Sequence, residues 1–379
     1  MLFALTETQE MIRETARRFA REHLAPGAIR RDEFEEFPAE PLRELAKLGF
    51  MGMMVPEQWG GIGLDTVSYI LAMEEIARVD ASVAVIMSVH NSLACGGLYA
   101  AGTESLKSKY LRELSSGRAL GAFALSEPEA GSDAANQHTT AVRDGDSYVL
   151  NGMKSWTTSG ANADVIIVMA ATDRAKGTKG ISAFLVEKGT PGLSVAKKEK
   201  KMGIRSSDTV ALAFSDCRIP ITNRLGEEGE GFKFAMRILE AGRVGIAAQA
   251  VGIAQASLDA SIKYARERKA FGKTLGEFQA IQLKLAEMAT GVEAARLLML
   301  HAASLKDQGR PFGKEASMAK LFASRTAVAN ALEAIQIHGG YGYVQEFQVE
   351  RYLRDAKVTE IYEGTSEIQQ LIIARSLLK

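Results

Sequence analysis

One glutamate near the carboxyl end of the sequence lies where it could act as a catalytic base. Glu363 precedes Ser366 and Gln369, whose spacing is typical of a helix capping box, and residues 369–378 then carry apolar side chains at helical intervals. We therefore expect Glu363 on the loop that enters a terminal helix. The unpaired N–H groups and partial positive charge of a helix start favour an ionised carboxylate and can hold a polar cofactor atom. The same pattern also fits a surface glutamate in an ordinary cap.

Two other segments combine residue types that suit a ligand. Residues 123–133 (FALSEPEAGSD) surround two bends with small and hydroxyl residues, and residues 154–160 (KSWTTSG) set Trp156 among hydroxyls. The first segment can present N–H and hydroxyl donors, but it also fits an ordinary exit from a strand. A tryptophan buries a large area, so Trp156 also fits a core position.

The composition sets broad limits on function. The 379 residues suffice for two or three domains with a large core, and Lys+Arg and Asp+Glu balance at 46 each. The balance does not favour nucleic acid as a partner. Two cysteines, Cys95 and Cys217, give no disulfide framework, which fits a reducing compartment such as the cytoplasm. We expect no metal site, because the histidines lack ligand spacing: His23, His90, His138, His301 and His338.

The amino-terminal residues predict a helix of the mature fold. Thr6 and Gln9 form a capping-box pattern ahead of an amphipathic stretch, with no basic region followed by an apolar signal core. The strongest apolar run, residues 165–171, is far shorter than the roughly 20 residues that span a bilayer. We expect a cytoplasmic chain without membrane insertion.

Hydrophobic periodicity divides the chain into three parts and predicts an α+β fold. Helical spacing dominates residues 1–120, a period of two dominates 121–225, and long Ala/Leu-rich helices fill 226–379. The predicted helices are 8–24, 39–49, 65–79, 81–101, 103–116, 231–268, 276–308, 313–338 and a last one from 366, with breaks at Pro26, Pro38 and Pro56. The predicted strands are 141–143, 148–150, 164–171, 181–187, 193–200 and 209–217, the first two forming a hairpin. The order predicts an N-terminal α-helical domain, a middle β domain and a C-terminal helical bundle.

Segregated strands and helices argue against a doubly wound nucleotide-binding sheet. Residues 339–342 (GGYG) lack the GxGxxG spacing and follow a predicted helix, while Glu267 stands where a P-loop needs glycine. Neither glycine-rich segment predicts a phosphate-binding loop.

Several motifs together resemble the acyl-CoA dehydrogenases over nearly the whole chain. They are residues 123–133, 156–160, 267–273 with 278–279, 336–342, and 354–357 running on to 362–365. The resemblance implies an α domain, a β barrel and a C-terminal four-helix bundle. It also implies FAD as cofactor, a homotetramer built as a dimer of dimers, and transient docking of an electron-transferring flavoprotein.

The resemblance assigns roles to individual residues. The flavin-binding loop and strand correspond to Phe123, Ala124, Leu125, Ser126, Ser132, Trp156, Thr157 and Thr158, with Thr158 near the flavin N5. The part that reaches a neighbouring subunit's FAD corresponds to Arg268, Phe271, Gln279, Gln336, Gly339 and Gly340. Thr365 and Glu367 complete the cofactor set. Without the resemblance, Arg268 would be interpreted as a solvated helix charge.

Substrate contacts are implied for Ser132, Glu240, Arg243 and Gly364. Glu240 and Arg243 alone also fit an i,i+3 ion pair on a helix surface. As the family's base, Glu363 would take the α proton of the thioester while the β hydrogen leaves as hydride to flavin N5, giving a trans-2-enoyl-CoA. Burial beside an acyl chain should raise the pKa of Glu363.

Two positions narrow the subtype. Isovaleryl-type members carry the base at the position of Gly242, and glutaryl-type members carry an arginine near the position of Ala84, so neither subtype is expected. The sequence 242–255 looks most like short-chain or butyryl-CoA members and their short-branched relatives. One alternative is an acyl-CoA oxidase that uses O₂, which is disfavoured because the sequence ends soon after the last predicted helix. A non-catalytic family member that acts as a binding protein, or a helical scaffold without cofactor, also remains open.

Overall fold

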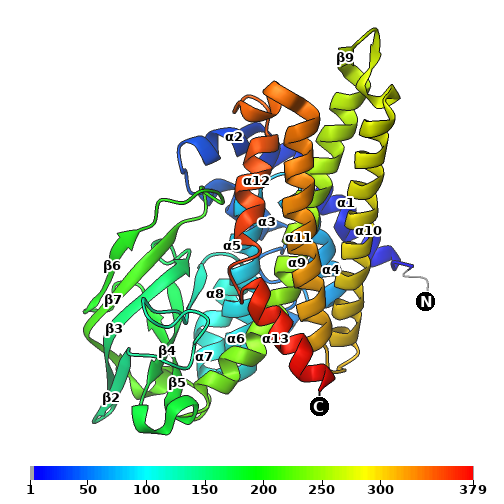
Figure 1. Ribbon diagram of the computed structural model, residues 1–379. Helices are drawn as coiled ribbons and strands as arrows, with labels where there is room; N and C mark the ends of the chain where they lie inside the picture. The colour runs from blue at the N-terminus through cyan, green and yellow to red at the C-terminus, as the bar shows by residue number, and fades with distance from the viewer. Residues whose placement is uncertain (1–3, 379) are drawn as a thin grey trace.

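The computed structural model describes residues 4–378, and its elements fall into three groups in chain order (Figure 1). Helices come first, an eight-stranded sheet follows, and long helices complete the chain, which confirms the expected α+β class. The amino-terminal helices are α1 (Glu7–Phe19), α2 (Ala25–Glu33), α3 (Ala39–Lys47), α4 (Thr66–Ala77), α5 (Ala81–Ser88), α6 (Gly96–Ala101), α7 (Glu104–Leu106) and α8 (Arg112–Ser115).

The capping box at the start of α1 is confirmed, but the break at Pro26 is not. The Thr6 side chain accepts from the Gln9 N–H, and the Gln9 side-chain oxygen accepts from the Thr6 backbone N–H. The helical path then runs through a π-helical turn at 20–24 directly into α2. Pro26 lies in the first turn of α2, directly after the π-helical turn, so the change of helix type falls just ahead of the proline that lacks an N–H.

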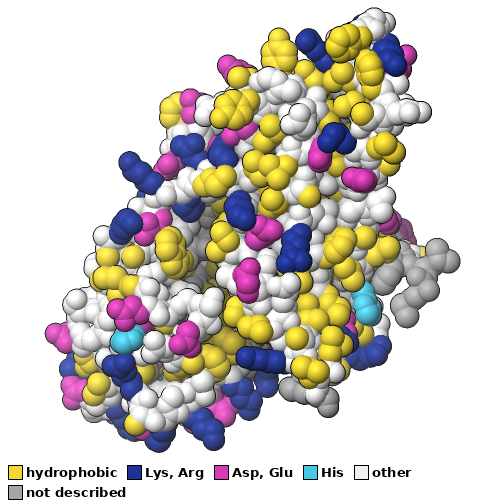
Figure 2. All heavy atoms as spheres, viewed as in Figure 1, with side chains coloured by type: hydrophobic (Ala, Val, Ile, Leu, Met, Phe, Trp, Pro, Cys, Tyr) yellow, Lys and Arg dark blue, Asp and Glu magenta, His cyan; other side chains and the backbone are white. Residues whose placement is uncertain are grey.

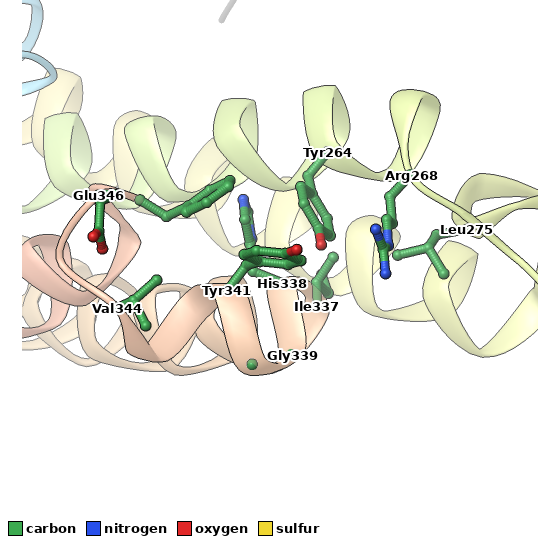
Figure 3. A pocket seen from close by; sticks show the side chains of 11 residues that line it. Tyr264, Arg268, Leu275, Ile337, His338, Gly339, Tyr341, Val344 and Glu346 are labelled. Atoms are coloured by element: carbon green, nitrogen blue, oxygen red, sulfur yellow. The ribbon is translucent and has the colours of Figure 1, made fainter.

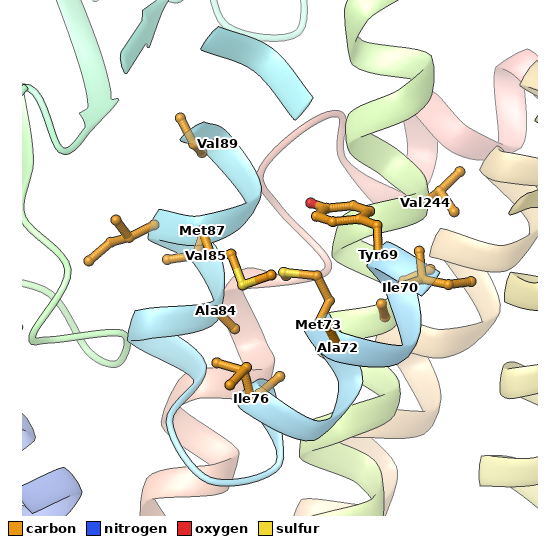
Figure 4. Packing of buried hydrophobic residues seen from close by; sticks show 14 of the residues in the cluster. Tyr69, Ile70, Ala72, Met73, Ile76, Ala84, Val85, Met87, Val89 and Val244 are labelled. Carbon is orange, nitrogen blue, oxygen red and sulfur yellow. The ribbon is translucent and has the colours of Figure 1, made fainter. Parts of the chain in front are cut away.

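The centre of the helical core is formed by α4 and by the continuous helical stretch 81–101, which joins α5 to α6 through a π-helical segment at 89–95. Figure 4 shows Met73 of α4 and Met87 of α5 facing each other, with Tyr69 beside Val244 of helix α9 (Gly231–Glu267). Residues 81–101 are long and apolar enough to cross a membrane by length and composition alone, yet 94% of the apolar window is buried inside the fold. The stretch therefore serves as a core helix.

The middle part is a mixed sheet. Its strands are β1 (Gly121–Ala124), β2 (Thr140–Asp144), β3 (Ser147–Thr158), β4 (Val165–Ala171), β5 (Ile181–Glu187), β6 (Leu193–Lys198), β7 (Thr209–Pro220) and β8 (Arg224–Leu225). The predicted hairpin is confirmed, since β2 and β3 pair antiparallel around the turn at Gly145. The strand order is β6-β7-β3-β2-β4-β5-β8, with β1 parallel to β4. Because no pairing among the described strands joins β6 to β8, the implied closed barrel is not seen.

The carboxyl-terminal part is helical. Besides α9 it contains α10 (Gln279–Asp307), α11 (Gly313–His338), α12 (Val349–Val358) and α13 (Ser366–Leu377), with a small hairpin of β9 (Lys269–Ala270) and β10 (Lys273–Thr274) beyond the end of α9. The helices α9, α10 and α11 lie side by side, and α12 and α13 pack against α11 (Figure 1). Buried alanines recur along α11 every three or four residues, which lets neighbouring helices approach closely. Helix α12 was not among the predicted elements.

A polar junction ties α12 to the sheet part and to the first helices. The Asp355 carboxylate accepts the Ile204 N–H at 2.6 Å, and the Arg354 guanidinium pairs with Asp32 of α2 at 2.7 Å and with Glu350. Burial raises the pKa of Asp355 to about 7, although the charge of Arg351 opposes the shift. The junction fixes the start of the loop that carries Glu363.

Candidate active site

Glu363 lies on the loop between α12 and α13, with its carboxylate inside the protein. The residue as a whole is half-buried, but both carboxylate oxygens are buried and neither has a hydrogen-bond partner among the described residues. A Cβ added to Gly242 of α9 would lie 2.2 Å from Glu363 Oε2, so the carboxylate rests on the backbone of that helix. The alternative of an exposed glutamate in a helix cap is therefore wrong.

The start of α13 differs by one residue from the prediction. The N-cap is Thr365, whose side chain accepts from the Ile368 N–H at 3.4 Å, so the predicted capping box of Ser366 with Gln369 does not form. Gln369 points back toward the loop instead. Its Nε2 donates to the carbonyl of Glu363 at 3.3 Å and to that of Gly364 at 2.8 Å. The side chain therefore holds the peptide that carries the glutamate.

Two buried cations face this loop. Lys320 of α11 is fully buried, and its Nζ donates to the Gly364 carbonyl at 2.7 Å. Arg243 of α9 is buried as well, and its Nε has no hydrogen-bond partner within residues 4–378. Burial raises the pKa of Glu363 to about 7, while the charges of Lys320 and Arg243 act in the opposite direction. The rise in the Glu363 pKa therefore comes from burial in the protein itself, and two cations moderate it, of which Lys320 was not predicted.

Glu240 and Arg243 do not form the i,i+3 ion pair that their spacing in the sequence also allowed. The ion pairs of the described residues include none between them, and the Glu240 carboxylate lies instead near Gly313, where an added Cβ would stand 2.9 Å from its Oε1. Arg243 is therefore available to a charged group that enters beside Glu363.

The structure brings the segments 123–126 and 154–158 together. Phe123 and Ala124 belong to β1 and are buried, while Leu125 and Ser126 follow on the loop. Lys154 of β3 donates to the Leu125 carbonyl at 3.0 Å and pairs with Glu127 at 2.7 Å. Glu127 in turn accepts from the backbone N–H groups of residues 138 and 139. This buried ion pair fixes the loop, and the sequence analysis did not single it out.

The end of β3 presents an aromatic ring and hydroxyls without partners. The pairing of β3 with β7 shifts register between Lys154 and Thr157, and Trp156 within the shift has a φ of 60°. The Trp156 side chain is 62% exposed, so the core interpretation is wrong. In the described part of the chain the buried hydroxyls of Thr157 and Ser159 lack hydrogen-bond partners, and Thr158 lies between them. An irregular strand with unpaired donors beside an exposed ring fits a planar, polar cofactor.

A third group of predicted residues lines a separate pocket of about 670 Å³ at the far end of the helices. Arg268, Gly339 and Gly340 are among its lining residues (Figure 3). The rings of Tyr264 and His338 stack with centroids 4.2 Å apart, and the Arg268 guanidinium lies 5.5 Å from the centre of the Tyr341 ring. A guanidinium among flat rings suits an anionic group attached to an aromatic base.

Three predicted residues lie outside that pocket lining. Phe271 is 95% exposed between β9 and β10, and Gln279 and Gln336 are exposed nearby on α10 and α11. Ser132 is likewise exposed, on the loop after β1, and Glu367 is exposed in the first turn of α13. In residues 4–378 no group of three or more His, Cys, Asp and Glu side chains is placed to hold a metal ion.

Helix α9 separates the two ends of the candidate site. Gly242, beneath Glu363, and Arg268, at the end of the helix, stand roughly 40 Å apart at about 1.5 Å per residue. A group bound beside Glu363 is therefore far from Arg268 of the same chain.

Comparison with known proteins identifies the family of the chain. The family models of the acyl-CoA dehydrogenase N-terminal, middle and C-terminal domains match residues 6–118, 122–217 and 229–378. The mitochondrial short-chain specific acyl-CoA dehydrogenase of Mus musculus is 53% identical over 375 residues, covering 99% of this chain and 91% of that protein.

Two solved structures are similar over the full length of both chains. The butyryl-CoA dehydrogenase of Megasphaera elsdenii is 47% identical with a TM-score of 0.99. A chain from the structure named for the electron transferring flavoprotein of Acidaminococcus fermentans is 48% identical, also with a TM-score of 0.99. Because the family models and these relatives together cover nearly the whole chain, the chain belongs to the acyl-CoA dehydrogenase family, whose members are FAD-dependent oxidoreductases.

Proposed function

We propose that the protein removes the α and β hydrogens of a short-chain acyl-CoA thioester, giving a trans-2-enoyl-CoA, and that Glu363 is the base. The observation that carries the proposal is the Glu363 carboxylate, which is buried, unpartnered and supported on the backbone of Gly242. A buried carboxylate that no protein donor holds can accept a proton from a ligand. With a pKa near 7 it is a stronger base than an ordinary glutamate and is still substantially ionised at neutral pH.

The α C–H of a thioester is a weak acid, so its removal requires stabilisation of the developing enolate oxygen. We assign this role in part to the backbone N–H of Glu363, on the rigid loop that Gln369 and Lys320 hold. The unpartnered Arg243 adds positive charge beside the same site. We assign the CoA part of the substrate to Ser132, Glu240, Arg243 and Gly364.

Bound FAD supplies the acceptor for the β hydrogen as a hydride. The residues present fit the flavin, because the unpaired hydroxyls of Thr157 and Ser159 and the exposed Trp156 ring lie next to the loop 123–126. We assign the flavin to this loop, to Trp156, Thr157 and Thr158, and to Thr365 and Glu367 at the start of α13.

A second copy of the chain completes the cofactor site in this proposal. The separation of Arg268 from Glu363 supports the assignment of Arg268, Phe271, Gln279, Gln336, Gly339 and Gly340 to the FAD of a neighbouring subunit. Figure 2 shows hydrophobic side chains over the face formed by the last helices. The exposed apolar residues of α10, α11 and α13 include Leu283, Phe322, Leu332 and Leu371. We infer a homotetramer built as a dimer of dimers, with domains at 1–120, 121–225 and 226–379.

The substrate and electron acceptor follow from the relatives. We infer a short, unbranched or slightly branched acyl group, because one relative is named short-chain specific and one solved relative is a butyryl-CoA dehydrogenase. Gly242 and Ala84 support the same inference, because they stand where the isovaleryl and glutaryl subtypes carry their characteristic residues. The similarity to a chain from a structure named for an electron transferring flavoprotein supports such a protein as the acceptor.

Anaerobic titration of the purified protein with butyryl-CoA tests the reaction. The oxidised-flavin absorbance should bleach in the wild type and persist in Glu363→Gln, with longer and branched thioesters bleaching more slowly. A flavoprotein that no acyl-CoA bleaches would contradict the proposal.

A further inference from the structure

The loop that carries Glu363 is held at its carbonyl oxygens by two side chains of different chemistry. The backbone at Glu363 and Gly364 has positive φ values of 50° and 93°, so the chain needs outside support to keep this turn. Gln369 donates a neutral amide to both carbonyls, and Lys320 donates an ammonium to the Gly364 carbonyl at 2.7 Å. One carbonyl therefore receives two donors.

The neutral amide of Gln369 already satisfies the Gly364 carbonyl, so hydrogen bonding alone does not account for a lysine here. Lys320 is fully buried, and taking an ammonium out of water is costly unless an opposite charge offsets it. No ion pair of Lys320 within 4.0 Å occurs among the described residues. The carboxylate of Glu363 is the buried acidic group whose charge acts most on Lys320, and Glu360 and Glu367 act more weakly.

We propose that Lys320 is a positioning residue for the base: its Nζ fixes the Gly364 peptide, and its charge holds the buried Glu363 in the ionised form that accepts the α proton. This inference rests on the proposed role of Glu363.

The groups around Glu363 come from several helices and must be considered together. Lys320 of α11 and Arg243 of α9 both lower the Glu363 pKa against the effect of burial. The charge of Glu363 also acts on the hydroxyls of Tyr69 and Tyr362, and burial raises the pKa of each so that they stay neutral. Tyr69 bonds Ser88, and Tyr362 bonds Gln249, so neither tyrosine is directed at Glu363 by its hydrogen bond. Of the two cations whose charges lower the Glu363 pKa, Arg243 alone remains when Lys320 is removed.

The test compares Lys320→Met with Gln369→Leu in the FAD-loaded enzyme. The readout is the pH dependence of kcat/KM for butyryl-CoA, which reports the base of the free enzyme. Both variants lose a donor to the loop, and both should lower the rate, by about tenfold or more. Only Lys320→Met removes a charge, and it should move the acidic limb of the profile to higher pH by about one pH unit.

Lys320→Arg tests the effect of the charge separately from that of the side-chain shape. It also replaces Lys320→Met in the test if that variant folds poorly. The guanidinium keeps the positive charge, so the limb should stay at the wild-type pH even where the rate falls. A limb that stays in place in Lys320→Met, or moves equally in Gln369→Leu, would overturn the inference and leave Lys320 as a structural clamp. Glu363→Gln is measured in parallel. If this variant keeps the wild-type rate, the assignment of Glu363 as the base fails. If it loses the rate while the acidic limb of Lys320→Met stays at the wild-type pH, only the inference about Lys320 fails.

Discussion

The Glu363 carboxylate and the backbone of Gly242 occupy adjacent space, so that a Cβ at Gly242 would lie 2.2 Å from Glu363 Oε2 and 3.2 Å from a methyl carbon of Leu93. Gly242 lies inside α9, and its backbone is not among the positive-φ positions of the chain. The glycine is therefore required for space and not for backbone conformation. The base and this glycine form one unit, contributed by two segments far apart in the sequence.

Gly242→Ala should separate helix stability from catalysis. Alanine is favoured over glycine inside a helix by about 1 kcal/mol, so the fold and the FAD content should survive. The new methyl must displace the Glu363 carboxylate, and kcat should fall by about tenfold to a hundredfold. The matched control is Gly96→Ala, where the added Cβ would meet only an ordinary contact at 3.4 Å. Equal rates in both variants would show that the carboxylate is not held where the structure has it.

Glu363→Gln should abolish proton abstraction while keeping the shape of the site. We expect a loss of about a thousandfold in the rate of flavin reduction, measured by stopped flow. In the wild type, kcat/KM should rise with pH through about 7, because burial raises the pKa of Glu363 and only the ionised form accepts a proton. The variant's residual rate should lack this limb, and persistence of the same limb would assign it to another group.

The same substitution should stabilise the folded protein by an amount that depends on pH. The pKa of Glu363 is raised in the folded protein, so its protonated form is favoured by folding, and that contribution is lost as pH rises from the unfolded value of 4.5 through about 7. A glutamine carries no charge at any pH. Glu363→Gln should therefore be more stable than the wild type at pH 8.5, by at most about 3 kcal/mol, and nearly equal at pH 5. Thermal unfolding at both pH values measures the difference, and a larger gain at pH 5 would contradict the sign.

The buried pair of Lys154 and Glu127 should matter more than any exposed pair. Both side chains are buried, and Lys154→Met leaves an unpaired carboxylate inside the protein, which costs about 3 kcal/mol or more. We expect a clear drop in the thermal midpoint together with weaker FAD retention, because the pair holds the loop at Leu125. Lys176→Met, which breaks the exposed pair with Asp173, is the control and should leave both quantities unchanged. A Lys154→Met protein with normal FAD content would argue against the link between this pair and the loop.

Local patterns in the sequence predicted most elements, because their signals are local. Helix α11 was predicted with its observed bounds, and the hairpin of β2 and β3 followed from the turn at Gly145. Residues 349–358 were missed although α12 is strongly amphipathic, since the helix is short and follows a glycine-rich turn. The barrel came from the resemblance, and closure of a sheet depends on long-range pairing that no local pattern encodes.

Site residues could be proposed from the sequence where the residue type alone indicates its chemistry. They could not be proposed where the role depends on whether the side chain is buried in the fold. Glu363 was proposed as the base from a carboxylate next to a helix start, and the structure places it on the loop before that helix, whose cap is Thr365. Lys320 lies in the middle of a predicted helix, where a lysine is normally solvated, and its contact with Gly364 joins residues 44 positions apart. The size of Trp156 alone also fitted a core position, but the ring lies within a register shift of β3 and is exposed.

Arg268→Ala tests whether a second copy of the chain completes the cofactor site. Arg268 is exposed at the end of α9, roughly 40 Å from Gly242 along that helix, so within one chain it has no route to a flavin beside Glu363. If a neighbouring subunit's FAD lies in the pocket of Figure 3, losing this guanidinium should weaken FAD binding by about tenfold, measured by titration of the apoprotein, with little change in the stability of the apoprotein. Arg266→Ala, an equally exposed arginine of the same helix that does not line the pocket, should bind FAD normally. Equal affinities in the two variants would place the cofactor within one chain and remove the main support for a shared site.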